Sequence, residues 1–380
     1  MKRYDENICL CTLNRIFGFS PKTGRALLEH FGSAGAVFSE GGKRIMEALP
    51  YTEGIGRITD EEYAVSEKEL AALSEEGCRF IGISDSGYPA LLRECGDAPL
   101  GLYIRTETTP EDIFNRRKAV AVIGTRDLSA YGREWCGRTV AALAESPDAP
   151  VIVSGLAIGV DITAHRKALE CGLPTIGVMA TGIDDIYPYR HRADGMRICS
   201  SQGCALVTDY PPHTAPKPVN FLRRNRIIAG ICSATILIES KAKGGGMMTA
   251  RLAFGYDRDV FALPGRADDI RSRGCNILIR EKVAEPIVGT DELLKSLGMK
   301  KGLPCTGNDL LSRYRPHIPE DRIDALSRIL LFIKQNRDSD IETIAEATGL
   351  EYSAVSGYIG LLEADGLIYV DLMRRCSIRI

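Results

Sequence analysis

Residues 119–126 contain an apolar run that ends in a glycine turn, and they read Ala119-Val120-Ala121-Val122-Ile123-Gly124-Thr125-Arg126. A continuous apolar run of this length is typical of a strand that is buried on both faces of a sheet. The glycine allows a tight turn, and Thr125 and Arg126 then place a hydroxyl group and a cation directly after the strand. The segment therefore predicts a buried parallel strand with polar groups at its carboxyl end.

Five further segments repeat this pattern of a short apolar run bounded by turn residues. They are Val151-Ile152-Val153, Thr175-Ile176-Gly177-Val178-Met179, Ala205-Leu206-Val207, Ala234-Thr235-Ile236-Leu237-Ile238 and Asp259-Val260-Phe261-Ala262-Leu263. Helical patterns separate them, and this alternation predicts an α/β fold with an extended Rossmann-like, doubly wound, mostly parallel sheet. Ligands of such folds bind beside the carboxyl ends of the strands, so the residues after each strand are candidates for a site.

Two more glycine-rich turns follow strands of this predicted sheet. The first contains Ser154, Gly155 and Gly159, and the second contains Lys243, Gly244, Gly245 and Gly246. Glycines at such turns let backbone N–H groups approach a phosphate, and the following helix adds a favourable dipole. Tight turns also need glycine for steric reasons alone, and the spacing is not the dinucleotide pattern G-x-G-x-x-G. Together, the three turns predict a groove that binds phosphate groups.

The most basic part of the chain follows the predicted fourth strand. It contains Lys217, Asn220, Arg223, Arg224, Asn225 and Arg226. No Asp or Glu occurs between Tyr210 and Ile238, although the whole chain has 48 basic and 50 acidic residues. Such a local positive field suits a polyanion. The alternative interpretation is a helix whose arginines are solvated or bound in salt bridges.

Composition places the chain among ordinary globular proteins. A length of 380 residues suggests two or three domains, and 44% apolar and 26% charged residues are usual values. No apolar run is long enough to cross a bilayer and the N-terminus lacks the pattern of a signal peptide, so we expect a cytoplasmic protein without membrane contact. The twelve cysteines are scattered without a C-x-x-C pair, which favours reduced, buried thiols.

Signals for catalysis are missing from the sequence. His165 follows Asp161 by four residues and could hydrogen-bond to it, but we favour Asp161 as the cap of a helix, with His165 either packed or facing solvent. Asp184 and Asp185 near His191 lack the spacing of metal ligands. No nucleophile elbow, phosphate-binding P-loop or zinc signature is present. We therefore expect no enzyme, no cofactor and no metal.

A set of motifs along the chain resembles one known family. The motifs are Asp85-x-x-Tyr88-Pro89-x-Leu91-Leu92 with Pro99 and Leu100-Gly101-Leu102-Tyr103, Gly124-Thr125-Arg126, Ser154-Gly155-Leu156-Ala157-x-Gly159-x-Asp161-x-x-Ala164-His165, Gly182-Ile183-Asp184 with Tyr187-Pro188, Asn220-Phe221-x-Arg223-Arg224-Asn225-Arg226-Ile227-Ile228-Ala229-Gly230, Thr249-Ala250, and Pro264-Gly265 followed by Ser272-Arg273-Gly274-Cys275-Asn276. Together they resemble the DNA-processing protein A (DprA/Smf) family of bacterial single-stranded DNA binders and recombination mediators.

The resemblance implies a non-catalytic protein that binds and protects single-stranded DNA in a positive pocket, forms homodimers and loads a RecA-type recombinase during natural transformation. The phosphate contacts that it implies are Gly124, Thr125, Arg126, Ser154, Gly155, Gly159, Lys217, Asn220, Arg223, Arg224, Asn225, Arg226, Lys243, Gly244, Gly245 and Gly246. Two positions depart from the family pattern. Ile158 stands where members commonly have Lys or Arg, and Thr125 stands where they commonly have Ser.

The remaining segments are expected to form flanking domains. Residues 1–66 are predicted as a helical, SAM-like or helix-hairpin-helix-like domain, residues 67–290 as the Rossmann-like domain, residues 291–319 as a linker and residues 320–380 as a winged helix. The hairpin at residues 17–26 has Ser20 in place of a turn glycine, which favours packing or partner docking over phosphate contact. The last 61 residues carry eleven acidic and seven basic residues. Protein contact or an auxiliary role is therefore favoured over reading of the DNA major groove, with Arg374 and Arg375 as the plausible phosphate contacts.

Two other classes of protein remain as alternatives. One is an enzyme of the lysine-decarboxylase-like nucleotide phosphoribohydrolase group, which carries Gly-Gly-x-Gly-Thr and a nearby catalytic Glu; no such Glu follows Gly246 here. The other is a winged-helix transcription regulator, which the acidic second helix disfavours. A nucleotide hydrolysis assay separates the first alternative from the binding protein, and footprinting on duplex operators separates the second.

Overall fold

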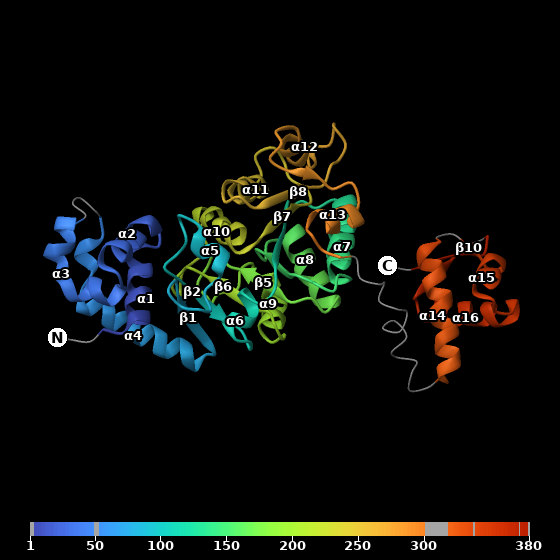
Figure 1. The fold of residues 1–380 in the computed structure, drawn as a ribbon, viewed down its shortest axis with the longest axis horizontal. Coiled ribbons are helices and arrows are strands. Elements are labelled where there is room, and N and C mark those ends of the chain that lie inside the picture. Colours follow the sequence, from blue (N-terminus) through green and yellow to red (C-terminus); the bar gives the residue numbers. More distant parts are fainter. Residues whose placement is uncertain (1–3, 49–52, 301–317, 337–338, 372, 379–380) are drawn as a thin grey trace. The chain divides into compact units, whose positions relative to one another are not determined.

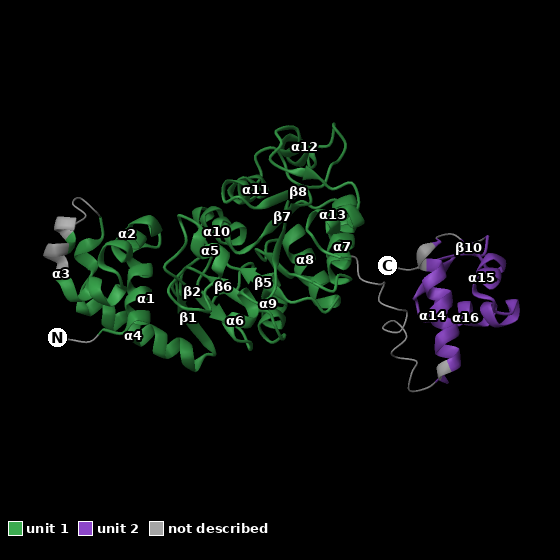
Figure 2. Ribbon diagram, in the orientation of Figure 1, with its two compact units in different colours: residues 1–300 green, residues 301–380 purple. Residues whose placement is uncertain are grey.

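The computed structural model describes residues 4–48, 53–300, 318–336, 339–371 and 373–378 of the chain. The chain divides into two compact units, Met1–Lys300 and Lys301–Ile380 (Figure 2). The first unit contains the large sheet, the three glycine-rich turns and the basic run, whereas Arg374 and Arg375 belong to the second unit (Figure 1). The second unit is small and mainly helical.

A nine-stranded sheet forms the centre of the first unit, in the order β1-β2-β6-β5-β4-β3-β7-β8-β9. The strands are β1 (Cys78–Gly82), β2 (Gly101–Arg105), β3 (Ala119–Ile123), β4 (Val151–Ser154), β5 (Thr175–Val178), β6 (Ala205–Thr208), β7 (Ala234–Leu237), β8 (Asp259–Ala262) and β9 (Glu285–Pro286). In the sheet, β6, β5, β4, β3, β7, β8 and β9 are neighbours in that order and run parallel. Strands β1 and β2 add an antiparallel edge next to β6. The predicted α/β class with a mostly parallel sheet is confirmed.

Helices cover both faces of the sheet. Successive side chains of a strand point to opposite faces, and because both faces are apolar, each must be buried under helices. In β3, Val120 and Val122 pack in one core cluster, whereas Ala119, Ala121 and Ile123 pack in the other. The helices after β2 are α6 (Pro110–Phe114), α7 (Ala130–Ala144), α8 (Val160–Glu170), η2 (Tyr189–His191), α9 (Arg192–Cys199), α10 (Pro218–Ile231), α11 (Gly245–Gly255), α12 (Arg273–Arg280) and α13 (Thr290–Ser296), and α5 (Ala90–Glu94) precedes β2. Apolar side chains of α7 and α8 enter the first cluster and those of α10 and α11 enter the second.

The N-terminal helices pack on the antiparallel edge of this sheet. They are α1 (Glu6–Phe17), α2 (Pro21–Phe31), α3 (Ala34–Ala48), η1 (Ile55–Arg57) and α4 (Asp60–Glu75). Their apolar side chains belong to the same core cluster as β1 and β2, and Asn14 donates from its side chain to the carbonyl of Asp209 at 2.9 Å. Helix α4 spans the predicted domain boundary at residue 66, and a separate N-terminal domain stays a prediction.

The second unit has its own core and a three-stranded antiparallel sheet. Its elements are α14 (Glu320–Gln335), β10 (Ser339–Asp340), α15 (Ile341–Thr348), α16 (Tyr352–Ala364), β11 (Ile368–Val370) and β12 (Arg375–Ile378). The predicted linker began at residue 291, but α13 occupies its first residues, and residues 301–317 lie outside the described part of the chain.

Two expectations about the whole chain can be checked on the described residues. Ten of the eleven cysteines among them are free and buried, and Cys171 is half-buried. No helix in the ranges described above is long and apolar enough to span a membrane.

Candidate nucleic-acid interface

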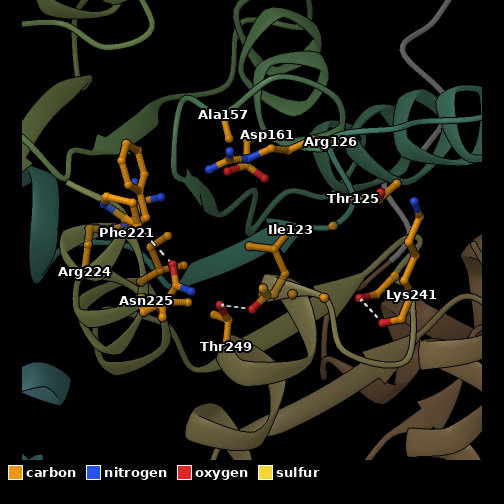
Figure 3. A pocket seen from close by; sticks show the side chains of 18 of the residues that line it. Ile123, Thr125, Arg126, Ala157, Asp161, Phe221, Arg224, Asn225, Lys241 and Thr249 are labelled. Carbon is orange, nitrogen blue, oxygen red and sulfur yellow. Dashed lines mark hydrogen bonds between the residues drawn. The ribbon is translucent and has the colours of Figure 1, made fainter. Parts of the chain in front are cut away.

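A cavity of about 620 Å³ opens at the carboxyl ends of β3, β4 and β7 and against α10 (Figure 3). The sheet order runs from β3 toward β6 on one side and from β7 toward β9 on the other. The cavity therefore lies where the direction of winding reverses, which is where open α/β sheets bind their ligands. The fold thus brings three loops and one helix, which are far apart in the sequence, to a single site.

Glycines hold the three loops against one another. Gly159 has a φ of +91°, and a Cβ there would lie 2.2 Å from the carbonyl oxygen of Thr125. The next residue, Val160, donates its N–H to that same oxygen at 3.2 Å. In the third loop, a Cβ at Gly246 would lie 2.7 Å from Leu237 and 3.5 Å from the Cα of Gly124. Gly159 therefore brings the first two loops together, and Gly246 brings the third loop onto the first.

About half of the residues predicted to contact phosphate line this cavity. They are Gly124, Thr125, Arg126, Arg224, Asn225, Gly244, Gly245 and Gly246. The others do not line it, and they are Ser154, Gly155, Gly159, Lys217, Asn220, Arg223, Arg226 and Lys243. Contact of any of these residues with a phosphate stays a prediction, but the geometry divides them into two groups.

Arg126 and Lys241 are the exposed cations that line the cavity. The guanidinium of Arg126 lies 5.4 Å from the ring centre of Phe221, and within the described parts of the chain it makes no hydrogen bond or ion pair with protein. Lys241 follows β7 as Arg126 follows β3, and both are labelled in Figure 3. Lys241 is not among the phosphate contacts predicted from the sequence. Its position just after a buried strand, like that of Arg126, would have been enough to predict it.

Arg224 is held inside the protein beneath the cavity. Its side chain is 4% exposed, and Nη1 donates to the carbonyl oxygens of Gly155, at 2.9 Å, and Val178. Burial lowers the pKa of Arg224 to about 10. Because Nη1 already has two protein acceptors, we expect Arg224 to fix the loop at Gly155 more than to bind a phosphate. A Cβ at position 155 would lie 2.5 Å from the guanidinium, so only glycine fits there beside Arg224.

Asp161 completes the charged floor of the cavity. The predicted role of Asp161 as a helix cap is wrong: α8 begins at Val160, and the carboxylate lies in its first turn, where it accepts the N–H of Gly155 at 3.2 Å. Burial raises the pKa of Asp161, and the charge of Arg224 opposes that rise. A buried carboxylate of this kind offsets the buried guanidinium beneath the loops.

Arg223 and Arg226 point away from the cavity into protein contacts. Arg226 forms a buried ion pair with Asp209 and also donates to the carbonyl of Asp97. Arg223 donates to the carbonyl of Gly18 at 2.8 Å. Asp209 lies one residue before the carboxylate-free window in the sequence. The alternative of salt-bridged arginines therefore describes Arg226.

His165 packs under the same loops rather than against Asp161. Its Nδ1 is 2.7 Å from the hydroxyl oxygen of Thr175, and its side chain is 1% exposed. Burial first, and the charge of Arg224 second, lower the pKa of His165 to about 3. Of the two alternatives that the sequence left open for His165, packed or facing solvent, the structure shows the packed one.

Acid is expected to destabilise the protein through His165. The unfolded chain binds a proton there below its ordinary pKa of 6.5, whereas the folded protein does so only near pH 3. The contribution of His165 is therefore complete above pH 6.5 and is lost as the pH falls toward 3, by up to about 1.4 kcal/mol per pH unit. Urea unfolding at pH 7.5 and pH 5.5 tests this. The variant His165→Gln should lose less stability on acidification than the wild-type protein, and an equal loss would contradict the assignment.

Two aromatic rings form a wall of the cavity. Tyr187 is 43% exposed, and its ring centre lies 5.5 Å from that of Phe221. Both rings line the cavity. No cluster of three or more His, Cys, Asp and Glu side chains suited to a metal ion occurs among the residues that the structure describes.

Comparison with known proteins gives a consistent set of relatives. The family model described as DNA recombination-mediator protein A matches residues 79–298. The putative DNA processing protein DprA of Mycobacterium tuberculosis is 32% identical over 311 residues, which cover 79% of this chain and 77% of that protein. The DNA processing protein DprA of Streptococcus pneumoniae is 36% identical over 225 residues, which cover 59% of this chain and 77% of the relative.

Two solved structures resemble this chain. The X-ray structure of DNA processing protein A from Streptococcus pneumoniae has a TM-score of 0.65 and 29% identity, and the match covers 78% of this chain and 98% of that one. The structure of DNA processing protein A from Helicobacter pylori has a TM-score of 0.51 and 28% identity, with coverage of 57% and 95%. That second structure is described by its single-stranded DNA binding mode.

Proposed function

The chain belongs to the DNA recombination-mediator protein A family, and from this premise we propose that it binds single-stranded DNA in the cavity at the carboxyl ends of β3, β4 and β7. The observation that carries the proposal is the pair of exposed cations, Arg126 and Lys241, on a cavity walled by glycine loops. Helix α11 also begins there at Gly245 without a side-chain cap. The N–H groups of Gly245 and Gly246 are therefore available to an anion, whereas that of Met247 donates to the carbonyl of Gly244 at 3.1 Å.

The aromatic wall supports a single strand rather than a duplex. Tyr187 and Phe221 line the cavity beside the two cations. Bases stack on such rings only when they are unpaired, whereas cations alone attract either form of DNA. A cavity that combines both features is suited to a strand whose bases are free. The single-stranded DNA binding described for the Helicobacter pylori relative points the same way.

The wider role is proposed on the family resemblance. In this proposal the protein is a cytoplasmic homodimer that performs no catalysis, protects incoming strands and loads a RecA-type recombinase during natural transformation. The second unit is proposed to be a winged helix that contacts protein. The order of its elements is compatible with that fold, and α16, which would be the reading helix, carries Glu363 but no Lys or Arg. The helices before β1 are proposed to form a SAM-like or helix-hairpin-helix-like domain.

The hydrolase alternative finds little support in the cavity. Glu239, the carboxylate next to the third loop, is fully buried and accepts hydrogen bonds from the N–H group of Ser129, at 3.0 Å, and from its hydroxyl group. It does not line the cavity. A general acid or base must reach the substrate, so Glu239 is better explained as the residue that fixes the start of α7.

Equilibrium binding over a salt series tests the proposed function. A labelled single-stranded oligonucleotide of mixed sequence and the matching duplex are titrated with the full chain, and the bound fraction is followed by fluorescence anisotropy. We expect tighter binding of the single strand, with a logarithmic salt slope of about −0.7 for each phosphate contact. Tighter binding of the duplex, or affinity that does not depend on salt, would refute the proposal.

A further inference from the structure

A second cavity, of about 500 Å³, adjoins the first one along α10. It is bounded by the turn between α1 and α2, by α10 and by α11, and Leu222 lines both cavities. Consecutive residues of α10 therefore lead from one cavity into the next: Phe221 lines the first, Leu222 lines both, and Arg223 lines the second. We call this second cavity the Phe19 groove after the aromatic residue that lines it.

The Phe19 groove presents apolar surface that the described part of the chain leaves uncovered. The exposed fractions are 60% for Phe19, 47% for Leu222 and 40% for Met248. Isolated exposed apolar side chains are common on proteins, but three of them around one hollow indicate a binding surface. The groove therefore has the apolar lining of a ligand site, together with a few polar groups.

Arg223 gives this apolar surface a fixed planar cation. Its guanidinium carbon lies 4.2 Å from the ring centre of Phe19, and Nη2 donates to the carbonyl oxygen of Gly18 at 2.8 Å. The hydrogen bond holds the guanidinium plane over the ring. Lys22 is exposed at the same groove. An aromatic ring, a guanidinium plane and a free ammonium group are the features that bind a base and its phosphate.

We propose that the Phe19 groove binds a nucleobase of the strand whose phosphates occupy the first cavity. This inference rests on the proposed function, because a strand held by its phosphates leaves its bases free to turn toward neighbouring surfaces. The continuity of the two cavities along α10 identifies the occupant. A protein segment fits less well, since a stable protein interface needs roughly 20–30 residues a side, and the groove is lined by far fewer.

The test compares two strands with equal numbers of phosphates. One is an oligonucleotide of thymine throughout, and the other has the same length but abasic sites at its central positions. The wild-type chain should bind the thymine strand more tightly. The variant Phe19→Ala should bind the thymine strand roughly five- to tenfold more weakly than wild type does, because it loses part of one stacking contact. Its affinity for the abasic strand should stay unchanged.

Two further variants separate stacking from other effects. Phe254→Ala removes another exposed phenylalanine, 54% exposed on α11, that lines neither cavity, so it should bind both strands as wild type does. Phe19→Tyr keeps a ring and should retain the preference for thymine. Thermal unfolding of each variant verifies that it is folded.

The outcomes distinguish this inference from the proposed function. If Phe19→Ala binds both strands as wild type does, or loses affinity equally for both, the groove does not bind a base and the inference is wrong. A protein segment as the true occupant would give the first of these results. If the wild-type chain binds neither strand, the proposed function fails, and the inference fails with it.

Discussion

Replacing Arg126 by Ala is expected to weaken the binding of single-stranded DNA about 10- to 100-fold near physiological salt, which is the loss of one charge-assisted hydrogen bond. Arg126 lines the first cavity, is exposed, and has no hydrogen bond or ion pair to protein within the described ranges. Its donors are therefore available to a phosphate, and its loss should affect all sequences alike. The logarithmic salt slope should fall by about 0.7 in magnitude. Fluorescence anisotropy over a salt series measures both quantities.

Two control variants show whether this loss comes from the contact or from charge in general. Arg79→Ala removes an exposed cation from β1, the edge strand of the sheet, and should leave affinity and salt slope nearly unchanged. Arg126→Lys keeps the charge but loses the paired donors of a guanidinium, so it should recover only part of the affinity. If Arg126→Ala and Arg79→Ala behave alike, Arg126 does not contact the strand.

The sheet and its loops could be predicted because their signals are local. Each apolar run from Ala119–Ile123 to Asp259–Leu263 became a strand, and the turns after three of them met at one site. A parallel strand buried on both faces needs continuous apolar sequence, and the loop that follows it needs small residues. Both requirements can be read from a few neighbouring residues, and the position of the site then follows from the topology.

The roles of individual arginines could not be predicted in this way. Arg224 and Arg226 are two residues apart in the same basic run, yet both are buried, and they donate to acceptors on other elements. Asp209 and the carbonyl of Gly155 reach α10 only through tertiary packing. A window free of carboxylates along the chain therefore does not imply a region free of them in space. Arg223 shows the same limit, since Gly18 is 205 residues away from it.

This division of roles changes the meaning of the basic run in α10. Cations that are buried and paired with protein cannot also be the main source of affinity for a polyanion, because reaching a phosphate would leave their partners uncompensated. The exposed cations of the first cavity, Arg126 and Lys241, instead come from the loops after β3 and β7. We therefore expect helix α10 to act mainly as a scaffold that fixes the loops on one side and Phe19 on the other.

Replacing Arg226 by Met is expected to destabilise the fold by about 3–5 kcal/mol, because it removes one partner of a buried ion pair. The side chains of Arg226 and Asp209 are 8% and 4% exposed. Oδ1 of Asp209 has no hydrogen-bond partner among the described residues. Arg226 is therefore the main group that neutralises the buried negative charge of this carboxylate. Urea unfolding followed by circular dichroism measures the loss. The matched control Arg266→Met breaks an exposed pair with Asp268 and should leave the unfolding midpoint unchanged.

A second substitution at Asp209 distinguishes a structural pair from a phosphate contact. In the double variant Arg226→Met with Asp209→Leu, no buried charge is left alone, so most of the lost stability should return. Binding of the abasic strand by the folded double variant should equal that of wild type, because Arg226 does not line the first cavity. A double variant that is as stable as wild type but has lost affinity and salt slope would show that Arg226 binds phosphate after all. A stable double variant that keeps the affinity of wild type would show that Arg226 serves to hold the fold in place and does not bind phosphate.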